Sequence, residues 1–103
     1  MNLRLEQYRI FNAVVECGSF SKASEALFMT QSAVSQAIKQ LENSIDMTLF
    51  KRTSKGVELT EAGNILYKYT VSAMELLETG LLRLESLKTL DDGELKIGAS
   101  DTI

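Results

Sequence analysis

The sequence contains no proline, no tryptophan and no histidine, and it has a single cysteine, Cys17. Without histidine and with one cysteine, metal sites of the Cys/His type are excluded. One cysteine cannot form an internal disulfide, which fits a reducing compartment and therefore the cytoplasm. We expect Cys17 to be a small buried residue beside a turn, and we expect neither a metal ion nor a cofactor.

Long apolar runs are also missing. The first residues, Met1–Leu5, are polar and charged and do not resemble a signal peptide. No run approaches the roughly 18 consecutive apolar residues that a membrane span requires. Acidic residues gather on a predicted long helix, where a solvated face explains them better than an acid/base pair. The stretch KGVELTEAG has two glycines without phosphate-binding spacing, so we expect no enzyme.

The formal net charge of −3 argues at first against a nucleic-acid partner, but the charges are unevenly distributed. Residues 21–57 carry five basic and three acidic side chains, whereas residues 58–94 carry three basic and eight acidic ones. Such asymmetry within a chain is more informative than its total charge. The excess of acidic residues lies in residues 58–94, and residues 21–57 are mildly basic.

The first third of the 103-residue chain predicts a tight pair of helices after an N-terminal one. Residues 5–16 carry apolar side chains at helical spacing, and Gly18 ends that helix. Ser21 is positioned to cap a short second helix, whose Ala23, Ala26 and Leu27 lie on one face. Only two residues, 28 and 29, separate it from a third helix capped by Thr30. This spacing is typical of a helix–turn–helix.

The third helix has an unusual polar face. Its apolar stripe comprises Val34, Ala37, Ile38, Leu41 and Ile45, all within about 60° of Val34 on a helical wheel. The opposite side carries Ser32, Ser35, Gln36, Lys39 and Asn43, with Gln31 on the flank. Glutamine can bond an adenine edge in two places, serine can bond a base or a phosphate, and lysine can reach guanine or phosphate. For this helix alone, base readout and an ordinary polar surface are equally good interpretations.

The neighbouring segments favour readout. Residues 49–52 and 57–59 predict two short strands joined by a turn at Ser54–Gly56. This hairpin carries Lys51, Arg52 and Lys55, which suit phosphate or minor-groove contact beside the major groove. A tight turn before the polar helix and a basic hairpin after it describe a winged helix–turn–helix, so the fold is predicted to be mainly α.

A long helix follows Thr60 and runs to about Leu90, which corresponds to a length of about 45 Å. Too few other residues remain to bury its apolar stripe, so we expect a partner helix from a second copy of the chain. The stripe comprises Leu66, Tyr69, Ala73, Leu76, Leu77, Leu81, Leu84 and Leu87. Beyond it, residues 94–99 predict a strand with no partner in this sequence, as if the chain entered another domain.

These residues resemble the LysR-type bacterial transcriptional regulators. The matching stretches are GSFSKASEAL (18–27), TQSAVSQAIKQLE (30–42), LFKRTSKGVELTEAG (49–63) and IGASDTI (97–103). The resemblance implies a winged helix–turn–helix DNA-binding domain over residues 1–59 and a linker helix over 60–90 that pairs antiparallel with its twin. Residues 91–103 would be a hinge and the first strand of an effector-binding domain like the periplasmic binding proteins.

The resemblance also implies site residues by position. Helix 31–45 would read the major groove of double-stranded DNA, and the wing at 50–58 would contact the backbone or minor groove. Ser100 and Thr102 would line a small-molecule pocket in the following domain. Two dimers of the full-length protein would be able to associate into a tetramer. The implied DNA contacts are Ser21, Lys22, Thr30, Gln31, Ser32, Ser35, Gln36, Lys39, Lys51, Arg52, Thr53 and Lys55, with Arg52 as the main wing contact.

Two positions depart from the family pattern, because many members have Pro at Ser32 and Arg at Gln36. The preferred base sequence therefore does not carry over. Two alternatives remain open at this point. One is a dimeric protein-interaction module, supported by the net acidity and the leucine-rich helix. The other is a different winged-helix repressor family, against which the partnerless strand at 94–99 argues.

Overall fold

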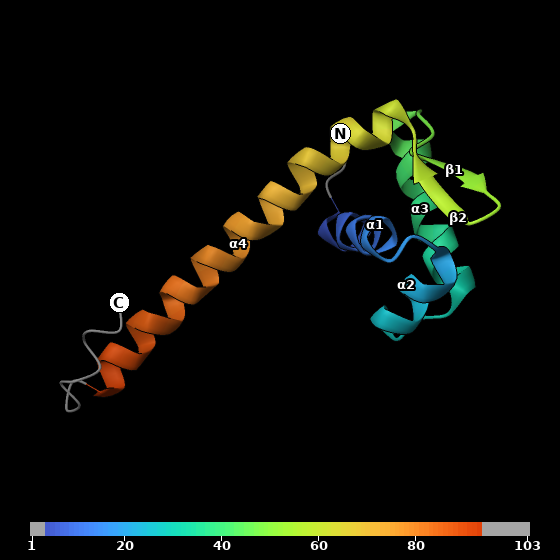
Figure 1. The fold of residues 1–103 in the computed structure, drawn as a ribbon. Coiled ribbons are helices and arrows are strands. Elements are labelled where there is room, and N and C mark those ends of the chain that lie inside the picture. The colour runs from blue at the N-terminus through green and yellow to red at the C-terminus, as the bar shows by residue number, and fades with distance from the viewer. Residues whose placement is uncertain (1–3, 94–103) are drawn as a thin grey trace. The chain divides into compact units, whose positions relative to one another are not determined.

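The computed structural model describes residues 4–93 and confirms a mainly helical chain with one small hairpin. The chain divides into two units, residues 1–71 and 72–103. The predicted strand at 94–99, together with Ser100 and Thr102, lies outside the described residues. Figure 1 shows the elements, which are α1 (Leu5–Cys17), α2 (Phe20–Leu27), α3 (Gln31–Ile45), β1 (Phe50–Thr53), β2 (Gly56–Leu59) and α4 (Glu61–Gly93).

The core of the first unit is apolar and lies where α1 meets α2, α3 and the hairpin. Phe11 and Val14 from α1, Val34 from α3 and Leu49 before β1 are all 0% exposed. The Phe11 ring centroid lies 5.4 Å from that of Phe50, which ties β1 to α1. Burying side chains of this size contributes roughly 1.5–3 kcal/mol each, so this cluster holds the helices and the wing as one body.

The end of α1 is as predicted, but the environment of Cys17 is not. Gly18 takes a left-handed conformation (φ 80°), and its N–H donates to the Val14 carbonyl oxygen at 2.9 Å. A residue without Cβ adopts this conformation at little cost. Cys17 is half-buried rather than buried.

The second helix begins earlier than predicted. Ser19, not Ser21, is its N-cap, and the Ser19 Oγ accepts from the Lys22 N–H at 3.0 Å. Starting there places Phe20 in the first turn, 7% exposed, where it packs on the core. The same shift leaves Ser21 and Ala26 exposed, whereas Ala23 is buried as predicted. Either serine could cap the helix, so the free energy gained by burying the Phe20 ring determines where the helix begins.

The tight turn between α2 and α3 is confirmed. Phe28 closes α2 in a left-handed conformation (φ 57°), and the Met29 N–H donates to the Ser24 carbonyl oxygen at 2.9 Å. Phe28 is 95% exposed, so its ring contributes nothing to the core. Thr30 then caps α3 as predicted, because its Oγ1 accepts from the Ala33 N–H at 3.0 Å.

The wing is an antiparallel hairpin in which Phe50 pairs with Leu59 and Thr53 with Gly56. The first strand is shifted by one residue from the predicted 49–52, since Leu49 lies in the core before β1, and the second begins one residue before the predicted 57–59. Gly56 has φ +136°, and a Cβ built there would lie 2.3 Å from the Gly18 carbonyl oxygen. Because the next N–H, from Val57, donates to that same oxygen at 3.1 Å, the wing is fixed against the turn between α1 and α2.

The long helix α4 runs from Glu61 to Gly93, so the predicted long helix is confirmed, and it continues through residues 91–93, which were expected to belong to a hinge. Thr60 caps it, accepting from the Gly63 N–H at 3.0 Å. A Cβ at Gly63 would lie 2.3 Å from the Leu49 carbonyl oxygen, so glycine permits the close approach of α4 to the wing. Thr70 is buried and its hydroxyl donates to the Asn12 side-chain oxygen on α1.

Candidate nucleic-acid interface

Helix α3 separates its apolar and polar residues as the sequence predicts. Val34 (0% exposed), Ile38 (3%) and Leu41 (1%) anchor it in the core. We call the predicted contact residues of its polar side the reading face, which comprises Thr30, Gln31, Ser32, Ser35, Gln36 and Lys39. Ser35 is half-buried, and the other five are exposed. Because one side of α3 is fixed by packing, the reading face is presented to solvent in a defined orientation.

The wing places a cation beside the reading face. The Arg52 guanidinium carbon lies 4.8 Å from the centroid of the Phe20 ring, over its face. A cation above an aromatic face is attracted by the ring quadrupole, by about 0.5–1 kcal/mol at exposed sites. Phe20 packs in turn against Phe50, with ring centroids 5.9 Å apart. This attraction favours rotamers that keep the exposed Arg52 guanidinium over a ring held by the core.

Three predicted contact residues from two elements line one depression. Ser35 and Lys39 of α3 and Arg52 of β1 border a hollow of about 190 Å³, together with Phe20, Ile38, Glu42 and Phe50. Residues far apart in the sequence are thus brought together around one small surface. Two cations and a hydroxyl on such a surface are groups that bind phosphate oxygens.

The other predicted contact residues lie on α2 and the wing, and all are exposed. Ser21 and Lys22 occupy the first turn of α2. Lys51 and Thr53 lie on β1, and Lys55 lies in the turn that follows. The Thr53 hydroxyl accepts from the Lys55 N–H at 3.2 Å, so this threonine shapes the turn in addition to facing solvent.

Two residues that position the site were not identified from the sequence. Phe20 supports Arg52, as described above. Glu42, from α3, accepts hydrogen bonds from the backbone N–H groups of Leu49 at 2.7 Å and Phe50 at 3.3 Å. A carboxylate that accepts two backbone N–H bonds fixes the start of the wing relative to α3. Glu42 is half-buried at the end of the polar face, and in the sequence it is one acid among many.

The stripe on α4 is exposed within the chain. Leu76 is 72% exposed, Leu77 47%, Leu81 62%, Leu84 61% and Leu87 59%. Tyr69 (68%) and Ala73 are exposed as well, and Leu66 is half-buried. Contiguous exposed apolar side chains are a common feature of surfaces that bind another protein.

Residues 4–93 contain no helix long and apolar enough to cross a bilayer. Over the same part of the chain, no group of three or more His, Cys, Asp or Glu side chains is placed to hold a metal ion.

The fold and this interface define a winged helix–turn–helix protein with a long appended helix. Residues 5–64 match the family described as "Bacterial regulatory helix-turn-helix protein, lysR family", and the chain belongs to that family.

Proteins of similar sequence and solved structures of similar fold agree with this family membership. A "Probable RuBisCO transcriptional regulator" of Cyanidioschyzon merolae (strain NIES-3377 / 10D) is 44% identical over 99 residues, which is 96% of this chain and 33% of that protein. A "RuBisCO operon transcriptional regulator" of Allochromatium vinosum is 39% identical over 103 residues, all of this chain and 34% of that protein. The chain thus spans about a third of the length of these relatives.

A crystal structure described as a "BenM_DBD/catB site 1 DNA Complex" matches with a TM-score of 0.80 and 29% identity. The match covers 84% of this chain and 98% of that one. The fold predicted from the sequence is therefore shown both by the structure and by its solved neighbours.

Proposed function

We propose that this chain is the DNA-binding part of a dimeric LysR-type transcription regulator. The reading face of α3 enters the major groove of double-stranded DNA, and the wing contacts the backbone or minor groove beside it. The observation that carries this proposal is the pairing of an uncharged, hydrogen-bonding helix face with Arg52 held beside it. Hydroxyls and amides read base edges, whereas the cations neutralise phosphates and give affinity without sequence information.

Each copy contributes one reading face, and the exposed stripe on α4 joins two copies through antiparallel helices. A two-fold dimer favours two half-sites related by the same symmetry. In a longer protein, a small molecule would act through a following domain and alter how the two reading faces are presented. The 103-residue chain itself is proposed to bind DNA without an effector, in the cytoplasm and without catalysis.

The rival interpretation, a dimeric module that only binds proteins, accounts for the leucines of α4 equally well. It gives no role to the reading face or to the gathering of Lys39 and Arg52 around one depression. Solved neighbours of this fold were crystallised with DNA, which also supports the DNA-binding proposal.

The test is a selection from a pool of random double-stranded DNA with the purified chain. The proposal predicts enrichment of a motif with two related half-sites. A control variant with Arg52 and Lys39 both replaced by Ala should enrich the motif weakly or not at all. If the wild-type chain returned an unenriched pool after repeated rounds, sequence-specific DNA binding would be excluded.

A further inference from the structure

A polar hollow lies on the first unit between the start of α1 and the C-terminal half of α3, and we call it the α1 hollow. It has a volume of about 240 Å³ and is lined by Arg4, Gln7, Gln40 and Ser44. The Gln7 amide donates to the Gln40 side-chain oxygen at 3.1 Å, which joins the two helices across the hollow. Of residues 4–93, none with a carboxylate lines it, so this lining offers an anion one cation and several hydrogen-bonding groups.

Arg4 and Gln40 have hydrogen-bond donors available for an anion. Arg4 is exposed, and within the described chain its side chain forms neither an ion pair nor a hydrogen bond. Gln40 uses its oxygen to accept from Gln7, which leaves its own amide N–H groups for a ligand. Ser44 is already engaged, since its hydroxyl donates to the Leu41 carbonyl oxygen at 2.8 Å. A guanidinium beside an amide N–H is well suited to phosphate oxygens.

The stability of α1 does not account for an arginine at position 4. Arg4 is the N-cap of α1, and its side chain makes no capping hydrogen bond. Serine, threonine, aspartate and asparagine stabilise an N-cap, and arginine is not among them. The partial positive charge at the start of a helix also repels a cation. Residues that violate such local rules occur mainly at functional sites, and an exposed cation suits the recognition of an anion.

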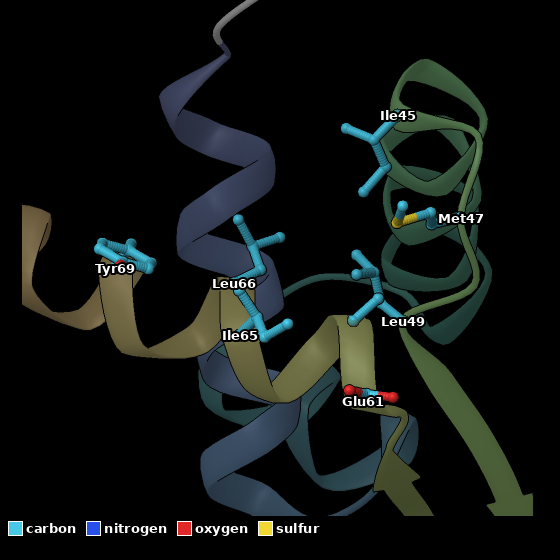
Figure 2. Close-up of a pocket in the computed structure, with 8 residues that line it drawn as sticks. Ile45, Met47, Leu49, Glu61, Ile65, Leu66 and Tyr69 are labelled. Atoms are coloured by element: carbon cyan, nitrogen blue, oxygen red, sulfur yellow. The ribbon is translucent and has the colours of Figure 1, made fainter.

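Two other hollows of the first unit are unsuited to an anion. One, of about 460 Å³, is surrounded by Met47 and other apolar side chains, with Glu61 at its border (Figure 2). Apolar groups give a phosphate no hydrogen bonds, and a carboxylate repels it. The other, at the end of α3, contains Lys39 but also the carboxylates of Glu42 and Asp46.

The α1 hollow and the depression beside Arg52 flank the reading face. With Val34 at 0° and 100° per residue, the α3 residues that line the depression lie between about 40° and 140° around the helix axis. Those that line the α1 hollow lie between about 240° and 280°. Gln36 of the reading face, at about 200°, lies between the two. Each hollow therefore borders one side of the face that is proposed to meet the bases.

An α-helix with its side chains is about 10–12 Å across and the major groove is about 12 Å wide, so a helix in this groove has a phosphate backbone on each side. We propose that the α1 hollow binds a backbone phosphate of the DNA strand opposite to the one that the wing contacts. This inference rests on the proposed function and adds a second phosphate site to it. Arg4 supplies the charge, Gln40 supplies a neutral donor, and Gln7 positions Gln40. Contacts to both strands fix how α3 lies in the groove.

The first test is the salt dependence of binding, measured by fluorescence anisotropy on a short duplex with one half-site recovered by the selection described above. Arg4→Ala should make the slope of log K against log salt shallower by about 0.9. This corresponds to roughly eightfold weaker binding at 0.1 M salt when the affinities at 1 M are equal. Arg4→Lys retains the charge and should retain the wild-type slope. Circular dichroism melting checks that the variants are folded.

Arg9→Ala is the matched control. Arg9 is an exposed cation of the same helix, paired with Glu6 at 2.9 Å and outside the α1 hollow, so its loss should leave the slope unchanged. Gln40→Ala should weaken binding roughly fivefold at the wild-type slope, because it removes an uncharged donor. If Gln40→Ala binds as tightly as wild type, the α1 hollow is not the phosphate site.

Neutral methylphosphonates, placed one at a time along both strands of the half-site, locate the contact. We expect one position at which wild-type binding weakens and Arg4→Ala is insensitive, and a second, on the other strand, at which Arg52→Ala is insensitive. Wild-type sensitivity of Arg4→Ala at every position, or both insensitive positions on one strand, would overturn the inference. A wild-type slope for Arg4→Ala with a shallower one for Arg52→Ala would do so while the proposed function stands. A wild-type chain that binds no DNA would end both.

Discussion

At the scale of single residues, the interface combines one positioned cation with uncharged hydrogen-bonding groups. Arg52 is exposed, yet the Phe20 ring 4.8 Å away restricts where its guanidinium lies. Gln36 is exposed on α3, four residues before Gln40, whose side chain instead accepts from the Gln7 amide at 3.1 Å. The two glutamines differ in surroundings although they lie on the same helix, and this difference permits a matched comparison.

Replacing Arg52 with Ala should weaken binding to all DNA sequences alike, because a phosphate contact carries no base information. The slope of log K against log salt should become shallower by about 0.9, the release of one counterion. Fluorescence anisotropy on two unrelated duplexes measures both effects. Lys68→Ala removes an equal charge from α4, outside the site, and should keep the wild-type slope. An unchanged slope for Arg52→Ala would remove this residue from the phosphate contacts.

Replacing Gln36 with Ala should instead alter discrimination between base pairs. A well-formed side-chain contact to a base edge contributes about 1–3 kcal/mol of discrimination. The measurement is the motif recovered from random duplexes, position by position. Gln40→Ala, which removes the same side chain from the same helix, should recover the wild-type motif. Identical motifs from all three proteins would show that Gln36 does not read DNA.

At the scale of elements, the wing is held by backbone contacts that no periodic pattern reveals. Val57 donates to the Gly18 carbonyl oxygen, and Glu42 accepts from the first residues of the hairpin. The hairpin has only four residues in each strand, too few to be stable by itself. Its orientation relative to α3 therefore depends on these few bonds and on the packing of Phe50.

Gly56→Ala tests this attachment. The added Cβ would lie 2.3 Å from the Gly18 carbonyl oxygen, and φ of +136° is unfavourable for alanine. We expect a loss of about 1–3 kcal/mol in the free energy of unfolding, measured by urea titration at fixed protein concentration. Ser54→Ala, two residues away in the exposed turn, should change it by no more than about 0.5 kcal/mol. Equal stability of the two variants would mean that the wing is free to move away from the turn after α1.

Helices α2 and α3 and the turn between them show which features of the elements were predictable from the sequence. The helical spacing of Val34, Ile38 and Leu41 was sufficient to predict α3 and its buried side, because one hydrophobic period dominates that segment. The N-cap of α2 was predicted at Ser21 and lies at Ser19, because the burial of Phe20 decided between two equivalent serines. The left-handed Phe28 could not have been predicted, since such turns favour glycine or asparagine.

Contacts between residues that are distant in the sequence could not be predicted. Asn12 and Thr70 are ordinary polar residues until folding places them together in the core. The same holds for Phe20 and Glu42, whose positioning roles depend on neighbours distant in sequence. The residue types of the reading face and the wing were recognisable because local pattern and family resemblance agreed. Their common depression depends on packing, which only the structure provides.

At the scale of the whole molecule, two reading faces per dimer should bind DNA far more tightly than one. Linking two binding events raises the effective concentration of the second, and avidity gains of roughly 10²–10⁴ are typical. The apolar stripe on α4, exposed in a single chain, is what we expect to provide this link. We therefore expect DNA affinity and dimerisation to be coupled.

Leu77→Glu should reduce affinity for a two-half-site duplex by roughly 10²-fold through loss of avidity. Its affinity for a duplex with one half-site should stay near that of wild type, because the reading face is untouched. Leu82→Glu is the control: Leu82 is 67% exposed on α4, on the other side of the helix from the stripe. Equal losses on both duplexes would indicate a misfolded variant or a direct role of Leu77 in DNA contact.

DNA binding by the wild-type chain is tested by an anisotropy titration with labelled random duplex DNA over a series of salt concentrations. We expect binding at low salt and a linear, steep decline of log K with log salt, with about 0.9 in slope for each phosphate contacted. The net charge of −3 makes this a demanding prediction, since the binding must come from the local cations of α3 and the wing. Absence of binding at low salt, or binding that salt does not weaken, would contradict it.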